Sequence, residues 1–173
     1  MNDKLEFLKG RRSCRSYKSD PVPQDLLDQI LTAGTYAATG KGRQSPIILA
    51  VTNQKIRDEL SRTNAEIMEG DGDPFYGAPV VLVVLAKKDI PTHVYDGSLV
   101  MGELMHAAHA LGLASCWIHR AKETFERPEW KEFLLSLGIT DEYEGIGNCI
   151  IGYPDGPLPE AKPRKEDWIY RVE

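Results

Sequence analysis

The sequence predicts a layered domain in which helices cover both faces of a buried sheet. Segments with helical periodicity alternate along the chain with short strand-like runs. These runs are apolar throughout, which is typical of strands that are buried on both faces. Composition alone therefore favours an α/β protein with a parallel sheet. Residues 1–173 contain no internal repeat or domain boundary, so we expect a single domain.

The first half of the chain contains three expected helices and two expected strands. Leu5 and Leu8 fall on one side of the first helix, and Gly10 is its stop signal. Pro21 and Pro23 precede the second helix, as is common at helix starts. The expected helices are residues 3–10, 24–33 and 54–68, the strands are 47–52 and 80–85, and the loops between them are 34–46 and 69–79.

The second half is dominated by one long apolar helix, expected over residues 95–113. Its apolar side chains lie on nearly all sides, so we expect it to be buried centrally or in a subunit interface. The tail 154–173 is rich in proline and charge and has little of its own to pack, so it should lie along another surface. The other expected elements are strands over 115–119 and 146–153 and a helix over 122–137.

Composition excludes several classes of protein. The chain is 42% hydrophobic and 27% charged, as in compact proteins, and its 26 acidic against 21 basic residues disfavour a nucleic-acid or anionic-membrane partner. Three cysteines without CxxC spacing support neither a disulfide framework nor a zinc site. The N-terminus lacks an apolar signal core, and the run 78–86 is too short to span a bilayer. We therefore expect a cytoplasmic protein.

Two basic clusters near the chain ends are candidates for an anion site. Residues 11–17 contain three arginines and two serines, and guanidinium groups bind phosphate through paired hydrogen bonds. Residues 160–165 contain two lysines and an arginine around Pro163, which stiffens the chain. Each cluster alone could be a solvated turn or tail. Together, in an acidic chain, they suggest a shared anionic ligand.

Two further segments are candidates for binding a flat ligand. Residues 39–46 contain glycines that would let the backbone approach such a ligand, and Gln44 could pair with a polar ring edge. The spacing is not that of a phosphate-binding Walker loop. Residues 115–120 end a strand with a tryptophan, a histidine and an arginine at an edge where open sheets bind ligands. An ordinary connection and a core tryptophan are the alternatives.

Three other patterns carry less weight. Glu103, His106 and His109 have the spacing of di-iron ligands, but a second Glu-x-x-His is missing, so we expect no metal. Residues 145–147 look like part of a dinucleotide fingerprint, yet they precede a strand instead of following one. No GxSxG motif is present, which disfavours a serine hydrolase.

Taken together, these motifs resemble the nitroreductase-like family of FMN flavoproteins. The resemblance implies an α+β fold, with a central, mostly antiparallel sheet flanked by helices. It also implies a homodimer in which the C-terminal tail is exchanged and the long apolar helix forms the interface core. We follow it over the parallel sheet, because buried strands have the same composition in both arrangements. The resemblance spans residues 11–171, and its motifs are 11–17, 40–46, 78–79, 112–117, 151–154 and 162–164.

The same resemblance implies which residues bind FMN. One basic set would hold the phosphate and the ribityl chain, and we expect only two intertwined subunits to bring its members together. Thr39 and Gln44 would come from the other subunit, and Asn64 would reach the pyrimidine edge. The phosphate set is Arg11, Arg12, Ser13, Arg15, Lys162 and Arg164, and the residues lining the isoalloxazine near N5 are Trp117, Ile118, His119 and Arg120. Many members of the family have other residue types at positions 38, 39, 42, 119 and 120, so the resemblance does not define the acceptor pocket of this chain.

The implied activity is electron transfer from NADH or NADPH to a small organic acceptor such as a nitroaromatic or a quinone. The nicotinamide would reduce flavin N5 and leave before the acceptor binds, in a ping-pong cycle. Because the flavin carries the chemistry, no side chain is expected to be catalytic, although His119 could protonate a product. Two alternatives stay open. One is a flavin-binding sensor, carrier or storage protein without turnover, and the other is a hydrolase of phosphorylated metabolites that uses residues 11–15.

Overall fold

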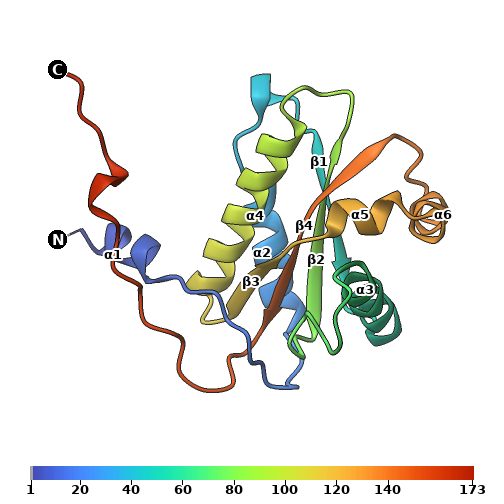
Figure 1. Cartoon of the computed structure of the whole chain (residues 1–173), viewed down its shortest axis with the longest axis horizontal. Helices are drawn as coiled ribbons and strands as arrows, with labels where there is room; N and C mark the ends of the chain where they lie inside the picture. The colour runs from blue at the N-terminus through green and yellow to red at the C-terminus, as the bar shows by residue number, and fades with distance from the viewer. Residues whose placement is uncertain (1) are drawn as a thin grey trace.

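The structure, a computed structural model, describes residues 2–173, which form a four-stranded sheet between two layers of helices (Figure 1). The strand order is β1-β2-β4-β3, and every neighbouring pair is antiparallel. The antiparallel sheet implied by the family resemblance is confirmed, and the parallel sheet favoured by strand composition is wrong. The strands are β1 (Pro46–Val51), β2 (Val80–Lys87), β3 (Ala114–Ile118) and β4 (Tyr143–Gly152).

Strand β2 shows why composition was misleading. Its side chains alternate between two separate hydrophobic cores, so both faces are buried although the strand is antiparallel to its neighbours. Val81 and Val83 belong to the core on one face, and Leu82 and Val84 belong to the core on the other. A strand covered on both faces has no need of polar residues at every second position, whatever the direction of its neighbours.

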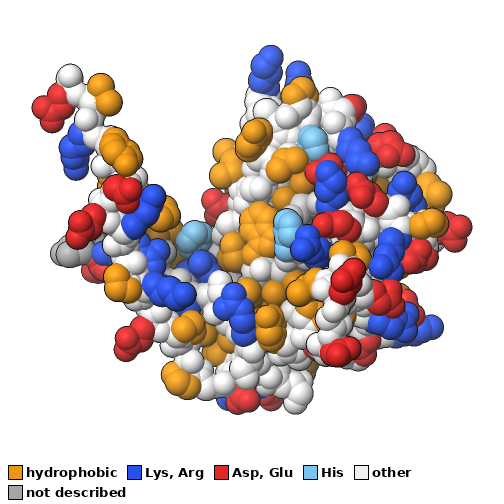
Figure 2. All heavy atoms as spheres, viewed as in Figure 1, with side chains coloured by type: hydrophobic (Ala, Val, Ile, Leu, Met, Phe, Trp, Pro, Cys, Tyr) orange, Lys and Arg blue, Asp and Glu red, His pale blue; other side chains and the backbone are white. Residues whose placement is uncertain are grey.

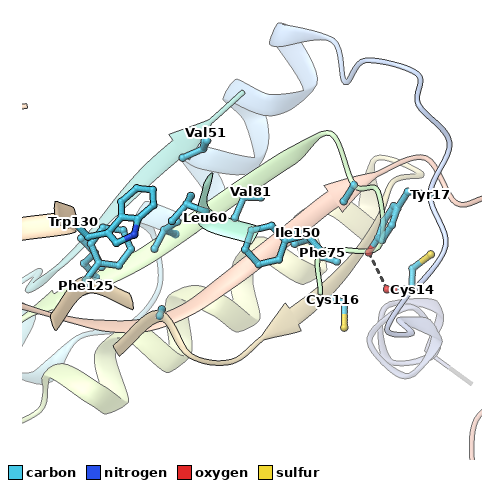
Figure 3. Close-up of a cluster of buried hydrophobic side chains, with 14 of the residues drawn as sticks. Cys14, Tyr17, Val51, Leu60, Phe75, Val81, Cys116, Phe125, Trp130 and Ile150 are labelled. Atoms are coloured by element: carbon cyan, nitrogen blue, oxygen red, sulfur yellow. Dashed lines mark hydrogen bonds between the residues drawn. The ribbon is translucent and has the colours of Figure 1, made fainter. Parts of the chain in front are cut away.

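Helices α2 (Gln24–Thr35) and α4 (His93–Ala110) cover one face of the sheet, and helices α3 (Gln54–Ile67), α5 (Ala121–Glu126) and α6 (Pro128–Ser136) cover the other. Figure 3 shows the core on the face covered by α3, α5 and α6, where the aromatic rings of Phe75, Phe125 and Trp130 lie among aliphatic side chains. Each face of the sheet thus has its own core.

The single helix expected over residues 122–137 is two helices, α5 and α6. Arg127, between them, has extended backbone angles (φ −70°, ψ 143°). The next residue is Pro128, whose ring disfavours helical angles at the preceding position. The other helices and strands were predicted within a few residues. Helix α4 ends earlier than expected, at Ala110, so three residues separate it from β3.

Helix α4 is buried on one side only. Val100, Met101 and Leu104 lie in the core, whereas Tyr95 and Leu99 are exposed in the chain by itself. The position of this helix between α2 and the chain ends is visible in Figure 1. Its predicted place in a subunit interface stays a prediction.

Both chain ends leave the body of the molecule on the same side (Figure 1). Helix α1 (Asp3–Gly10) buries none of its residues. The tail is exposed from residue 159 onward, including the short 3-10 helix η2 (Glu166–Trp168). The tail therefore carries large apolar side chains without a core of its own. No helix within residues 2–173 is long and apolar enough to cross a membrane.

Candidate functional site

A basic cleft lies where the two chain ends pass each other, and basic side chains gather there in Figure 2. Its volume is about 920 Å³, and six basic but only two acidic side chains line it. Because the chain as a whole has a net charge of −5, this is a strong local excess of positive charge. The cleft contains the whole predicted phosphate set, Arg11, Arg12, Ser13, Arg15, Lys162 and Arg164.

Backbone pairing explains why residues from opposite ends of the chain meet. Ser13 pairs with Ser115 at the edge of β3, and Tyr17 pairs with Pro154, just beyond β4. The backbone N–H of Asp155 donates to the carbonyl oxygen of Ser16 at 2.9 Å. The start of the tail is thereby fixed beside the arginine motif. The expectation that two subunits are needed to bring the basic residues together is therefore wrong, since one chain suffices.

The arginine motif is anchored to the core by its own apolar members. Cys14 and Tyr17 are buried, whereas Arg15 between them is exposed. The Tyr17 hydroxyl donates to the Cys14 carbonyl oxygen at 3.0 Å, the dashed line in Figure 3. Burial raises the pKa of Tyr17 well above its ordinary value of 10.0, so the phenol stays a neutral donor. This anchoring fixes the direction in which the arginines project.

The hydrogen bonds of the arginines show which of their donors already have partners. Arg12 Nη1 donates to the carbonyl oxygens of Lys9 (2.6 Å) and Arg11 (2.9 Å), and Arg164 donates to that of Lys162 (2.6 Å from Nη2). Arg11 Nη1 is buried and has no hydrogen-bond partner within residues 2–173. A buried, unpaired donor is costly, more so when it is charged. A dianionic phosphate would supply the missing acceptor, so the residues present fit the phosphate group of FMN.

His109 lies beside these arginines but adds no positive charge at neutral pH. Its ring stacks on the ring of Phe7, with the ring centroids 4.9 Å apart, and this contact packs α1 against α4. Burial lowers the pKa of His109, and the positive charges of Arg11, His106 and Arg12 lower it further. No group of residues within 2–173 has the composition and proximity of a metal site, and His106 Nδ1 lies 3.0 Å from the carbonyl oxygen of Gly102 in its own helix.

The end of β3 presents the flat residues that the sequence singled out. Trp117 packs over β4, where a side chain at Gly147 would place its Cβ 2.6 Å from the indole Nε1. Glycine at this position therefore lets the indole lie against the sheet. Ile118 packs against the core on the other face, and His119 is exposed. Arg120 has a left-handed backbone (φ 79°) and an ion pair with Glu123 at 3.0 Å.

Two buried asparagines hold this strand end in place. Asn64 Nδ2 donates to the His119 carbonyl oxygen at 2.7 Å, and Asn148 Nδ2 lies 3.3 Å from the same oxygen. The Oδ1 atom of each is buried without a partner within residues 2–173. Asn64 is thus placed behind His119, fully buried. Sequence reasoning missed Asn148, although one amide within an otherwise apolar strand was a signal.

Thr39 and Gln44 lie apart from the basic cleft. They line a second cavity of about 530 Å³, between α2, β1 and α4. Thr39 is half-buried and Gln44 is exposed, and the Gln44 N–H donates to the Thr39 hydroxyl at 3.1 Å. One chain therefore does not bring these two residues to the arginines. Their expected contribution to the site of another subunit stays a prediction.

Comparisons with known proteins match most of the chain. The model of the family described as Nitroreductase family matches residues 8–153, which include the arginine motif and all strands of the sheet. A solved nitroreductase with bound FMN from Bacteroides fragilis has a TM-score of 0.88 and 29% identity over 100% of both chains. The similarity to an FMN-bound structure thus extends over the tail.

Two curated relatives are more distant in sequence. A protein of Methanothermobacter thermautotrophicus, named as a candidate NADH dehydrogenase/NAD(P)H nitroreductase, is 28% identical over 119 residues, which cover 66% of this chain and 60% of the relative. The chain therefore spans less than two thirds of that relative's length. The FMN reductase [NAD(P)H] of Bacillus subtilis is 24% identical over 95% of this chain and 70% of its own length.

Proposed function

Because this chain belongs to the Nitroreductase family, we propose that it is an FMN-dependent oxidoreductase that uses NADH or NADPH to reduce small organic acceptors, such as nitroaromatics or quinones. The observation that carries this proposal is the basic cleft, with its buried and unpartnered Arg11 Nη1. The names of the relatives support the choice of cofactor and reductant, since they specify FMN or NAD(P)H.

The residues of the cleft are suited to hold the phosphate end of FMN. Arg11 has a free donor, and Arg15 is exposed at the same cleft. Arg12 and Arg164 are turned onto backbone carbonyl oxygens, which fixes their positive charges at the rim. Guanidinium groups remain charged at every physiological pH, so the cleft attracts a phosphate dianion under all such conditions.

The residues at the end of β3 are suited to the ring system. When bound, FMN would supply the chemistry by accepting a hydride from the nicotinamide and passing electrons to the acceptor. Trp117 would exclude water from one side of the ring. His119 is exposed, so its imidazole is free to hold or donate a proton at the acceptor. Reductant and acceptor would use the same open face in turn, as in a ping-pong cycle.

The second subunit in this proposal completes the site. Thr39 and Gln44 lie away from the cleft of their own chain, so they would serve the flavin of a homodimer partner. The exposed apolar side chains support association. Trp168 is 65% exposed and Tyr170 is 79% exposed on the tail, and Leu99 is exposed on α4. Several large apolar side chains exposed to solvent are typical of an interaction surface.

The absorbance spectrum of the purified protein, followed by anaerobic titration with NADH and with NADPH, tests the proposal. We expect a flavin spectrum that one or both nicotinamides bleach and that an added quinone or nitroaromatic restores. A bound flavin that neither nicotinamide reduces would instead identify a protein that binds flavin without turnover. A colourless protein with phosphatase activity would contradict the proposal and favour a hydrolase.

A further inference from the structure

Asp96, in the first turn of α4, is a buried carboxylate with three hydrogen bonds. It is 2% exposed. Its Oδ1 accepts from the backbone N–H of Gly40 at 2.9 Å, and its Oδ2 accepts from the hydroxyls of Ser45 (2.9 Å) and Thr92 (3.0 Å). Two of these donors lie more than fifty positions earlier in the chain, in the loop between α2 and β1. The carboxylate thus joins this loop to α4.

The two distant donors stand next to the residues proposed to reach the partner's flavin. Gly40 directly follows Thr39, and Ser45 directly follows Gln44. The Gln44 N–H donates to the Thr39 hydroxyl at 3.1 Å and closes the loop between them. Asp96 therefore clamps both ends of this segment, in which Lys41, Arg43 and Gln44 are exposed.

The loop needs such a clamp because its backbone is strained. Lys41 (φ 56°), Gly42 (φ 64°) and Gln44 (φ 50°) are all in the left-handed region. Residues other than glycine persist in this region only where the surroundings impose it, and such strain gathers at functional sites. Short 3-10 helix η1 (Gly40–Gly42) also packs tightly, since a Cβ on Gly40 would lie 2.4 Å from Thr92 Oγ1. The clamp and the tight packing together hold the loop in one shape.

The charge of Asp96 strengthens the clamp. Burial raises the pKa of this carboxyl, but the Gly40 N–H and the Ser45 and Thr92 hydroxyls outweigh burial, with help from nearby His93, so that the pKa is lowered overall. The group is therefore an anion at neutral pH, and hydrogen bonds to an anion are stronger than those to a neutral acceptor. The sequence offered no signal for this role, because Asp96 looks like any acidic residue near a helix start.

We propose that Asp96 is a positioning residue that holds Thr39 and Gln44 in the geometry with which they contact the flavin of the partner subunit. This inference rests on the proposed function. Asp96 itself touches the loop and not the cofactor, so its loss should weaken FMN binding through the loop alone. Neither the basic cleft nor the end of β3 is among its hydrogen-bonding partners.

Three variants test the inference by FMN affinity and thermal stability. Asp96→Ala removes both acceptor oxygens and with them all three hydrogen bonds. Its dissociation constant for FMN should rise about tenfold, which corresponds to the loss of one or two neutral hydrogen bonds between the loop and the flavin. Asp96→Asn can still accept from Gly40 and donate to Ser45, so it should retain most of the affinity. Asp73→Ala is the matched control, because Asp73 also ties a loop to a helix, by accepting from Arg57 and Ser61.

The outcomes separate positioning from general stability. We expect Asp73→Ala to lower the melting temperature while its FMN affinity stays close to that of the wild type. Wild-type affinity in Asp96→Ala would overturn the inference, and so would an equal loss of affinity in Asp73→Ala. If Asp96→Ala does not fold, Ser45→Ala removes one end of the clamp. Its affinity for FMN should fall by about threefold, which corresponds to the lower end of the range for one neutral hydrogen bond.

Hydrogen exchange in the apoprotein keeps this test independent of the proposed function. The amides of Gly40 and Gln44 should exchange faster in Asp96→Ala than in the wild type, whereas the amide of Gly77, held by Asp73, should not change. A wild-type protein that binds no FMN would contradict the proposed function alone. Unchanged exchange at Gly40 would contradict the role of Asp96 as a clamp.

Discussion

Replacement of Arg11 and Arg15 by alanine is the most direct test of the phosphate site. Arg11 Nη1 is a buried donor without a partner, and Arg15 is an exposed cation at the same cleft. A hydrogen bond to a charged group contributes about 1.5–3 kcal/mol, so two such bonds contribute about 3–6 kcal/mol. At about 1.4 kcal/mol for each factor of ten, the double variant should bind FMN about 10²- to 10⁴-fold more weakly and purify as apoprotein.

The assay is fluorescence titration of the apoprotein with FMN and, separately, with riboflavin. Riboflavin lacks the phosphate, so its affinity should be similar in the wild type and the double variant. Arg62→Ala is the control for charge, because Arg62 is 71% exposed on α3 and only approaches Glu66 at 3.9 Å. Higher salt should weaken FMN binding to the wild type more than to the double variant, since ions screen the exposed charges.

Two results would refute the reasoning. One is full flavin occupancy in the purified double variant, because the cleft would then not hold the phosphate. The other is an equal loss of FMN and riboflavin affinity, because the arginines would then act on the ring or on the fold. For either result to count, the circular dichroism spectrum of the double variant must match that of the wild type, which shows that its secondary structure is preserved.

Three further perturbations probe the tail, the histidine and the strand end. Truncation after Pro159 should yield monomers or aggregates in light scattering, and an intact, active dimer would contradict tail exchange. The pKa of His109 lies below 6.5 when folded, so its contribution to stability is present above pH 6.5 and lost as the pH falls. The melting temperature should therefore drop less between about pH 7 and 5 in His109→Gln, and an identical drop would exclude this role. Gly147→Ala should lower the free energy of unfolding, measured by chemical denaturation, by about 1–3 kcal/mol, because the new Cβ would clash with Trp117. Gly102→Ala, which has open space around its Cβ, should not lower the free energy of unfolding. Equal losses of stability in the two variants would contradict the packing argument.

The positions of helices and strands could be predicted because they depend on local sequence. The exception is the break between α5 and α6, where Pro128 was a visible signal whose effect on Arg127 was overlooked. Strand direction could not be read from β2, since both faces of this strand are buried in either arrangement. The family resemblance, and not the composition, predicted the antiparallel sheet.

The candidate site was predicted as a set of residues but not as an arrangement. The basic residues of 11–15 and 162–164 were identified from their chemistry, and the structure places them in one cleft. Asn148 and Asp96 were missed because their roles depend on hydrogen-bond partners far away in the sequence. Asn64 donates to the backbone of His119, and its expected contact with the ring edge stays a prediction.

The sequence by itself determined which chemical groups the protein carries, because a guanidinium group is able to bind phosphate wherever the chain places it, and a glycine permits left-handed turns in any context. Only the tertiary structure decided which groups meet. The pairing of Ser13 with Ser115 and of Tyr17 with Pro154 brings the two chain ends to one cleft. Such pairing depends on which strand edges are left open after the sheet has formed, and local sequence carries no record of that choice.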